Sequence, residues 1–509
     1  MATDDASIAA RLRTRYERLA AFREPYLAAW REVARFAAPQ ADAGRFGGDP
    51  QSPRLTGDAE VVEQAAAFAA QRLAAFLADT VAPYGQRWHE LRPVGDGAES
   101  GPALQAWLDE VRDLLFRLRE DPLAGFQGAL ESVLLDLVLY GTAVLYVAHE
   151  PGLGPRYEPV PVGEVVLGAD RAGRVDVVFR EYRLPARELE AAFGTVPERW
   201  RAKVATAPDE PVRVLHAVVP AEPGSRWRWA SYHLLEGEIV RAAGYDTMPY
   251  CVVRMWLSSG EIYGRGPGIL ALRNMKRANR VARDMVILAN RQAQPPLLAV
   301  DADEALSLEP DALNYGWLDA ATGRPRVLPL ELGGSLQVAM AMHERDLRAI
   351  EEHFLLSLML MAQDKAMTAT EVVQRAQERG VMLGPVVGRI QQELLGPMIV
   401  RELAIAEAEG FVPPPPPGVA LPPLAIHYET PALRQMAAQD GLAVVRALDA
   451  IAPIARLDPS ALAALDLPRA ARVIAESFGV PASVLRDEKE VRRALEALTA
   501  GALAGGGAA

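Results

Sequence analysis

The residues with the clearest chemical potential are the glycines of YGRGPG, residues 263–268, because a glycine-rich turn can wrap a phosphate group. A phosphate loop continues with Gly-Lys-Ser/Thr, whose lysine and hydroxyl hold the outer phosphate and its magnesium ion. The chain contains no Gly-Lys pair, and Ile269 stands where the dinucleotide-binding motif requires glycine. We therefore interpret these glycines as a tight turn leading into a helix with Pro267 in its first turn.

A strongly basic segment follows this turn. Between residues 271 and 294, six cations stand against Asp284 alone, a local balance of +5 in a chain whose net charge is -12. Helical spacing separates a basic face from an apolar stripe that packs. The members of the basic face are Arg273, Lys276, Arg280 and Arg283, and those of the stripe are Leu272, Met275, Ala278, Ala282, Met285 and Ala289.

Two interpretations of this basic face stay open. It contacts DNA phosphates, or it is a solvated face that forms ion pairs with acidic residues of a neighbouring helix. The carboxylates available for such pairs are those of Glu344, Asp346, Glu351 and Glu352.

Motifs for catalysis or metal binding are absent. The seven histidines form no His-x-x-x-His or His-x-His pair, and no Gly-x-Ser-x-Gly elbow occurs. The acidic run DADE, residues 301–304, is a better candidate for a loop than for a cation site. We expect neither an enzyme nor a bound cofactor or metal.

Composition narrows the class of protein further. With 509 residues, 50% hydrophobic and 24% charged, the chain is long enough for several segments with real cores. Its single cysteine, Cys251, excludes a disulfide framework and indicates a reducing compartment. Neither a signal peptide nor 18 consecutive apolar residues occur, so we expect no membrane insertion. The net charge argues against a general nucleic-acid binder.

The pattern along the chain predicts a helix-rich α+β protein. Alternating runs broken by Gly, Pro and Asp predict an antiparallel β region over 141–257. Two long helices flank an insert, residues 295–336, that Pro and Gly break into short elements. The predicted helices up to this point are 7–38, 57–80, 101–119, 125–140, 266–294 and 337–361.

A third long helix has an explicit start signal. Thr368 and Glu371 form a capping box, so this helix should begin at Ala369. Gly-Pro pairs at 384–385 and 396–397 predict a bend at one or both sites. The segment 412–423 should be extended polyproline, followed by helices over 431–498 and a loose glycine-rich tail.

Seven segments, in this order, resemble the head-to-tail connector (portal) proteins of short-tailed, podovirus-type bacteriophages. The resemblance runs from about residue 10 to about residue 430. The segments are RYERLAAFREPYLAAWREVARFAAP, AAQRLAAFLADTVAPYGQRWHEL, LLDLVLYGTAVLYV, GRVDVVFREYRL, GEIYGRGPGILALRNMKRANRV, QAQPPLL and MTATEVVQRAQERGVMLGPVVGRIQQELLGPMI.

The resemblance implies a portal fold around a central channel and assigns the pieces of the chain. It implies a ring, a dodecamer, at one capsid vertex of the virion, assembled in the host cytoplasm. The expected pieces are a wing, 1–257; a first stem helix, 258–294; a clip, 295–336; a second stem helix, 337–361; a tunnel loop, 362–368; a long kinked wing helix, 369–410; a Pro-rich connector, 411–430; a helical crown, 431–500; and a flexible tail, 501–509.

The resemblance also suggests roles for particular residues. Candidates for the DNA channel are Lys276, Arg280, Arg283, Gln363 and Lys365. Candidates for ion pairs between subunits are Arg277, Arg291, Glu344 and Glu351. Arg324 and Arg326 of the clip are candidates for docking the terminase.

The implied partners are double-stranded DNA, the terminase large subunit, a tail adaptor protein, and capsid and scaffolding proteins. The missing ATPase motif agrees with a separate terminase motor. The alternative is a stand-alone DNA-binding or scaffold protein of prophage origin without a channel.

Overall fold

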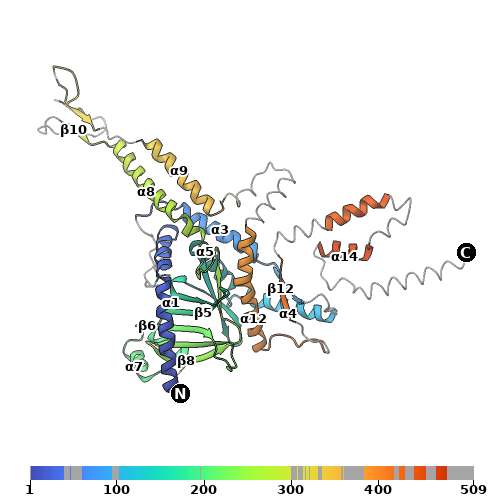
Figure 1. Cartoon of the computed structure of the whole chain (residues 1–509). Coiled ribbons are helices and arrows are strands. Elements are labelled where there is room, and N and C mark those ends of the chain that lie inside the picture. Colours follow the sequence, from blue (N-terminus) through green and yellow to red (C-terminus); the bar gives the residue numbers. More distant parts are fainter. Residues whose placement is uncertain are drawn as a thin grey trace.

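The computed structural model shows a helix-rich α+β chain in which a two-helix hairpin projects from a mixed body (Figure 1). The hairpin and the body belong to one continuous chain. The structure describes residues 2–38, 46, 60–94, 102–194, 196–299, 306–307, 313, 315, 317–319, 321–330, 335–356, 359, 383–417, 423–429, 441–453 and 466–477.

Four N-terminal helices form at the predicted places. They are α1 (Ala2–Ala37), α3 (Ala65–Val81), α4 (Pro102–Glu120) and α5 (Phe126–Tyr140). The predicted start of the second helix at residue 57 was wrong, because residues 60–64 are not helical. The helix begins only after Gln64, where the long apolar run that packs against the body starts.

The predicted antiparallel β region is confirmed as two sheets. The smaller has the order β3-β2-β9 and the larger the order β4-β5-β6-β7-β8, with every pair antiparallel. Helices α6 (Leu189–Phe193) and α7 (Glu198–Thr206) lie in the connection between β5 and β6. The strands are β2 (Thr142–Glu150), β3 (Gly154–Val160), β4 (Val165–Ala169), β5 (Val175–Pro185), β6 (Pro211–Pro220), β7 (Trp229–Leu235), β8 (Glu238–Tyr245) and β9 (Tyr250–Arg254).

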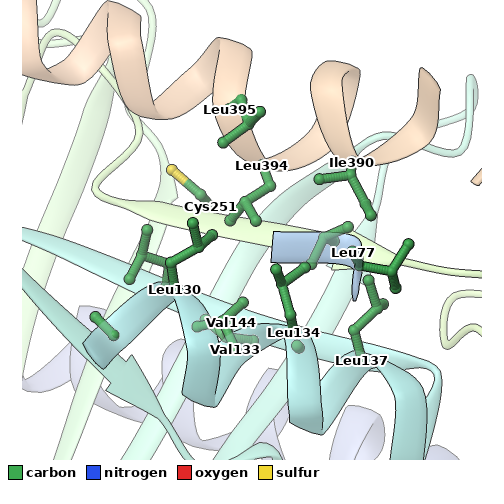
Figure 2. Packing of buried hydrophobic residues seen from close by; sticks show 14 of the residues in the cluster. Leu77, Leu130, Val133, Leu134, Leu137, Val144, Cys251, Ile390, Leu394 and Leu395 are labelled. Carbon is green, nitrogen blue, oxygen red and sulfur yellow. The ribbon is translucent and has the colours of Figure 1, made fainter. Parts of the chain in front are cut away.

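Helix α5 lies at the centre of the main core. Its side chains are apolar on nearly every face, which is the pattern of a fully buried helix. Figure 2 shows leucines and valines of α5 beside Leu77 of α3, Cys251 of β9 and leucines of a late helix. Burial raises the pKa of the Cys251 thiol, so this cysteine behaves as an inert apolar side chain.

The hairpin contains the two long helices predicted around the insert. Helix α8 (Pro267–Ala293) matches the prediction of 266–294, whereas α9 (Leu336–His353) ends earlier than 361, before a turn in which Leu355 has φ 55°. At the far end, β10 (Leu297–Ala299) pairs with β11 (Val327–Pro329). The insert therefore contains short elements, as predicted.

A late helix crosses the body and contains an irregular turn before the second Gly-Pro pair. Residues 383–390 are α-helical, Gln391–Leu395 (η3) form a π-helical turn, and α12 (Gly396–Ala408) continues the helix. The π turn lies directly before Gly396-Pro397, where Pro397 cannot donate a backbone hydrogen bond. Tyr428 Oη donates to the Gln391 carbonyl oxygen at 3.0 Å. The capping box at Thr368 lies outside the described residues.

The segment after the prolines returns to the body as a strand. β12 (Leu424–Tyr428) pairs antiparallel with β1 (His89–Pro93). The sequence analysis did not predict β12, which lies inside the Pro-rich connector. Earlier in the connector, the Trp107 indole donates to the Pro413 carbonyl oxygen at 2.9 Å. Further along, residues 441–453 and α14 (Leu467–Ser477) are helical, as expected for this region.

One buried and one partly buried ion pair join the late helix to the body. Arg119 Nε donates to both carboxylate oxygens of Glu402 at 3.0 Å, and Tyr157 Oη donates to Glu402 Oε1 at 2.5 Å. Arg254 of β9 donates to Glu393 of the π turn, with Nη2 to Oε1 at 2.6 Å. Burial, and next the Glu402 carboxylate, raise the pKa of Tyr157, so this hydroxyl keeps the proton that it donates.

A row of cationic and titratable groups crosses the larger sheet. Directly paired positions run Arg180, His216, His233 and Arg241 along β5 to β8. The two imidazoles stack with centroids 4.0 Å apart, and His216 contacts Tyr250 Oη at 2.7 Å and Ser231 Oγ at 2.9 Å. Burial, followed by Arg241, lowers the pKa of His233 to about 4.

Replacing Glu402 by Gln should destabilise the chain strongly. The variant leaves the Arg119 charge buried without a counter-charge, and breaking a buried pair in this way costs about 3–5 kcal/mol. Replacing the exposed Glu222, which pairs with Arg11 on the surface, should cost under about 1 kcal/mol. Urea unfolding followed by circular dichroism measures both. Equal small losses would show that the buried pair does not hold the late helix.

Acidification should destabilise the chain through its buried histidines. An unfolded histidine titrates near pH 6.5, whereas His233 titrates near 4 in the fold, so the unfolded state binds more protons between these values. Stability contributed by neutral His233 is complete above about pH 6.5, falls by about 1.4 kcal/mol per pH unit below it, and levels off near pH 4.

The variant His233→Phe should reduce this pH dependence. The control variant His427→Asn, which changes an exposed histidine, should retain it. The measurement is the urea midpoint at pH 7 and at pH 5. A pH dependence unchanged by His233→Phe would contradict the assignment.

Candidate functional site

The start of α8 is set by backbone packing against the end of α5. Gly264 N donates to Thr142 Oγ1 at 2.8 Å. A Cβ at Gly266 would lie 2.6 Å from the Val138 carbonyl oxygen, and one at Gly268 would overlap that of Leu139. Each of these glycines is therefore required for close backbone approach.

This packing shows that YGRGPG has a structural role and is not a phosphate-binding loop. Pro267 is in the first turn of α8, and Pro267 and Gly268 are both buried. The space that a phosphate would need at the helix N-terminus is filled by the main chain of α5. The prediction that Pro267 lies in the first turn of a helix is confirmed, but the predicted tight turn was wrong, because Arg265 pairs with Trp256 in an antiparallel bridge and Gly266 is extended.

A buried asparagine holds α8 to the body. Asn279 Oδ1 accepts hydrogen bonds from Val62 N at 2.8 Å and from Glu63 N at 3.2 Å, while its Nδ2 donates to Glu60 O at 3.0 Å. The sequence analysis missed this residue. The available signal was that Asn279 follows Met275 and Ala278 on the side of the helix that packs.

Arg277 joins the two long helices. Its Nε donates to both carboxylate oxygens of Asp346 at 2.8 Å, and Asp346 is 1% exposed. This hydrogen bonding raises the pKa of Arg277, so the guanidinium stays charged. The partner lies on α9 of the same chain, whereas the sequence analysis made Arg277 a candidate for an ion pair between subunits.

The predicted channel residues of α8 differ in their surroundings. Lys276 forms an ion pair with Glu32 of α1, and Arg283 lies 3.9 Å from Glu60. Arg280 is exposed and forms no ion pair with the residues that the structure describes. The structure therefore separates three cations that the sequence treated as one group.

The remaining predicted site residues do not gather around a common point. Glu344 pairs with Arg348 one turn later at 3.5 Å, and Glu351 is exposed on the same helix. Arg291 is exposed near the end of α8. Gln363 and Lys365 lie outside the described residues, and so does the acidic run at 301–304.

Arg324 and Arg326 both follow a tight turn at residues 321–322 of the insert. Both side chains are exposed. Their backbones close the turn, with Asp319 N donating to Arg324 O at 2.9 Å and Arg326 N donating to Trp317 O at 2.9 Å. The two guanidinium groups are thus exposed at the far end of the hairpin.

Within the described part of the chain, no group of three or more His, Cys, Asp or Glu residues could hold a metal ion. No helix in those same ranges is long and apolar enough to cross a bilayer. What the structure offers instead is a long basic helix, rigidly mounted on a body.

A model of the family described as bacteriophage head to tail connecting protein matches residues 9–485. The chain belongs to this family. Among curated connector relatives, a probable portal protein of Bordetella phage BPP-1 is 25% identical over 92% of this chain and 87% of its own length. A portal protein of Salmonella phage epsilon15 is 24% identical over 88% of this chain and 85% of its own length.

Solved structures include a chain from the neck of an empty gene transfer agent particle, computed with C6 symmetry. Its TM-score is 0.39 at 14% identity, and the match covers 75% of this connector chain and 86% of that chain. A chain from the neck of the native particle, computed with C12 symmetry, gives a TM-score of 0.37 at 14% identity, covering 79% and 86%.

Replacing Gly266 by Ala should destabilise the chain by about 1–3 kcal/mol, because its Cβ would meet backbone oxygens that cannot move aside. The matched control is Gly388→Ala in the late helix, where a Cβ meets nothing within 4 Å. That control should be neutral or stabilising by up to about 1 kcal/mol. Thermal unfolding of both variants would measure the difference, and a neutral Gly266→Ala would refute the packing argument.

Proposed function

We propose that this chain is the portal subunit of a short-tailed phage and forms the ring-shaped channel through which DNA enters and leaves the capsid. The observation that carries this proposal is the connector-family match over residues 9–485, supported by two curated relatives named as portal proteins. The YGRGPG segment and the basic helix then serve to build a wall of the channel.

The exposed apolar side chains of the hairpin support a ring of identical copies. The outer half of both helices and the short strands beyond them display apolar groups to solvent in the single chain. Large exposed patches of this kind mark interfaces, and contacts between copies that close on themselves form rings. The exposed residues are Val286, Leu297, Leu298, Leu328, Val338, Met340 and Met342.

Within this ring we propose the following parts. Residues 1–257 with the late helix form the wing, α8 and α9 the stem, and 295–336 the clip. The tunnel loop (362–368), the crown (431–500) and a copy number of twelve belong to the same proposal. Arg324 and Arg326 at the tip of the hairpin would face the terminase or the tail adaptor.

The proposed chain catalyses no reaction. The terminase large subunit would hydrolyse ATP and move the DNA, while this chain would bind capsid and scaffolding proteins at one vertex. Assembly would take place in the host cytoplasm. This division of labour agrees with the lack of a Gly-Lys phosphate loop in the sequence.

Native mass measurement and electron microscopy of the purified chain should show a closed ring. Met340→Glu should weaken the ring, because it places a charge among exposed apolar groups of the stem, whereas Met340→Leu should retain it. Neither variant should unfold the subunit, since Met340 is 48% exposed. A wild-type chain that stays monomeric or dimeric at micromolar concentration would favour a stand-alone DNA-binding or scaffold protein instead.

A further inference from the structure

Three arginines of α8 have no partner in the described part of the chain. Lys276, Arg277 and Arg283 lie beside carboxylates of Glu32, Asp346 and Glu60, which come from other segments of the same subunit. The remaining cations are all exposed and form no ion pair with described residues; they are Arg273, Arg280 and Arg291.

These three arginines lie on one line along the helix. The steps of seven and eleven residues turn the helix by about two and three full turns, so the side chains leave it in nearly the same direction. The line runs for about 27 Å at ~1.5 Å per residue. We call it the arginine ridge.

The ridge is on the side of α8 opposite the packed side. Ala271, Met275 and Ala278 are buried on that packed side. Halfway along the ridge, Asp284 is also exposed and points the same way by helical spacing. The ridge thus carries three positive charges and one negative charge.

We propose that the arginine ridge is the face of α8 that contacts the phosphate backbone of double-stranded DNA, and that Lys276 and Arg283 are not. This inference rests on the proposed channel function. Guanidinium groups bind phosphate oxygens in planar, paired geometry, and such contacts carry no sequence information. A sequence-independent contact is what a channel for a whole genome requires.

The spacing of the ridge keeps the contact weak. The first two arginines are about 10 Å apart along the helix, and Asp284 repels phosphate between the second and the third. Each subunit therefore offers isolated contacts in place of a continuous basic surface. The subunit's own acids neutralise the other cations, which limits the grip on DNA further.

A neighbouring copy is the competing occupant of the ridge. Its carboxylates could come from Glu351 and Glu352 of α9, which are exposed. Asp284 would repel those acids, as it repels phosphates in the proposed contact with DNA. Glu344, the third exposed acid, is already paired with Arg348.

The test compares two variants of the full chain. One replaces all three ridge arginines, R273Q/R280Q/R291Q, and the other replaces the two cations that have intrachain partners, K276Q/R283Q. The probe is a double-stranded DNA fragment of mixed sequence, and its affinity for the assembled protein is measured from low to moderate salt.

The ridge variant should assemble normally but lose roughly tenfold or more in affinity at low salt, and its dependence on salt should be shallower by about 0.9 in log-log slope per lost phosphate contact. The control variant should bind like the wild type.

Four results would separate the alternatives. Equal binding by wild type and ridge variant, or a wild-type ring that binds no DNA even at low salt, would overturn the ridge assignment. A ridge variant that folds but no longer forms rings would assign the ridge to the neighbouring copy. A wild type that forms no ring would instead refute the proposed channel function.

Discussion

The structure depends on one contact between backbones, where residues 264–268 lie against the last turn of α5. Helix α5 is the centre of the main core, so whatever is fixed to its end is fixed to the whole body. Glycine is the residue that permits this approach, because any Cβ would occupy the place of a carbonyl oxygen. The direction of α8, and with it the position of every cation that it carries, follows from this contact.

Charged residues secure the second long element, the late helix. Three charged side chains of this helix contact the body. Glu393 accepts from Arg254, and Glu402 accepts from Arg119. Arg401 donates to the Val147 carbonyl oxygen. Buried ion pairs add little net stability compared with apolar packing, but a misplaced helix would leave each charge unpaired. They therefore specify one position of this helix and disfavour all others.

Local patterns predicted the elements well, and remote partners explain what was missed. The bounds of α8 were visible because a turn, a first-turn proline and a terminal double proline surround one uninterrupted helical pattern. β12 was hidden because its partner β1 lies more than 300 residues earlier, and no local signal marks that pairing. Likewise, the sequence could not divide the cations of α8, since Glu32 and Glu60 belong to distant segments.

The pairing of β1 with β12 can form only late in translation, because the two strands are far apart in the sequence. His89 to Pro93 leave the ribosome long before Leu424 to Tyr428, which are needed to cover them. At 5–20 residues per second, the delay is roughly 15–70 s. During most of this interval Arg119 also lacks its partner Glu402, and the edge of β1 that later pairs with β12 is exposed. The pairing of β1 with β12 can form only after residues 424–428 have been translated. A nascent chain stopped before residue 424 would therefore be a substrate for chaperones and proteases.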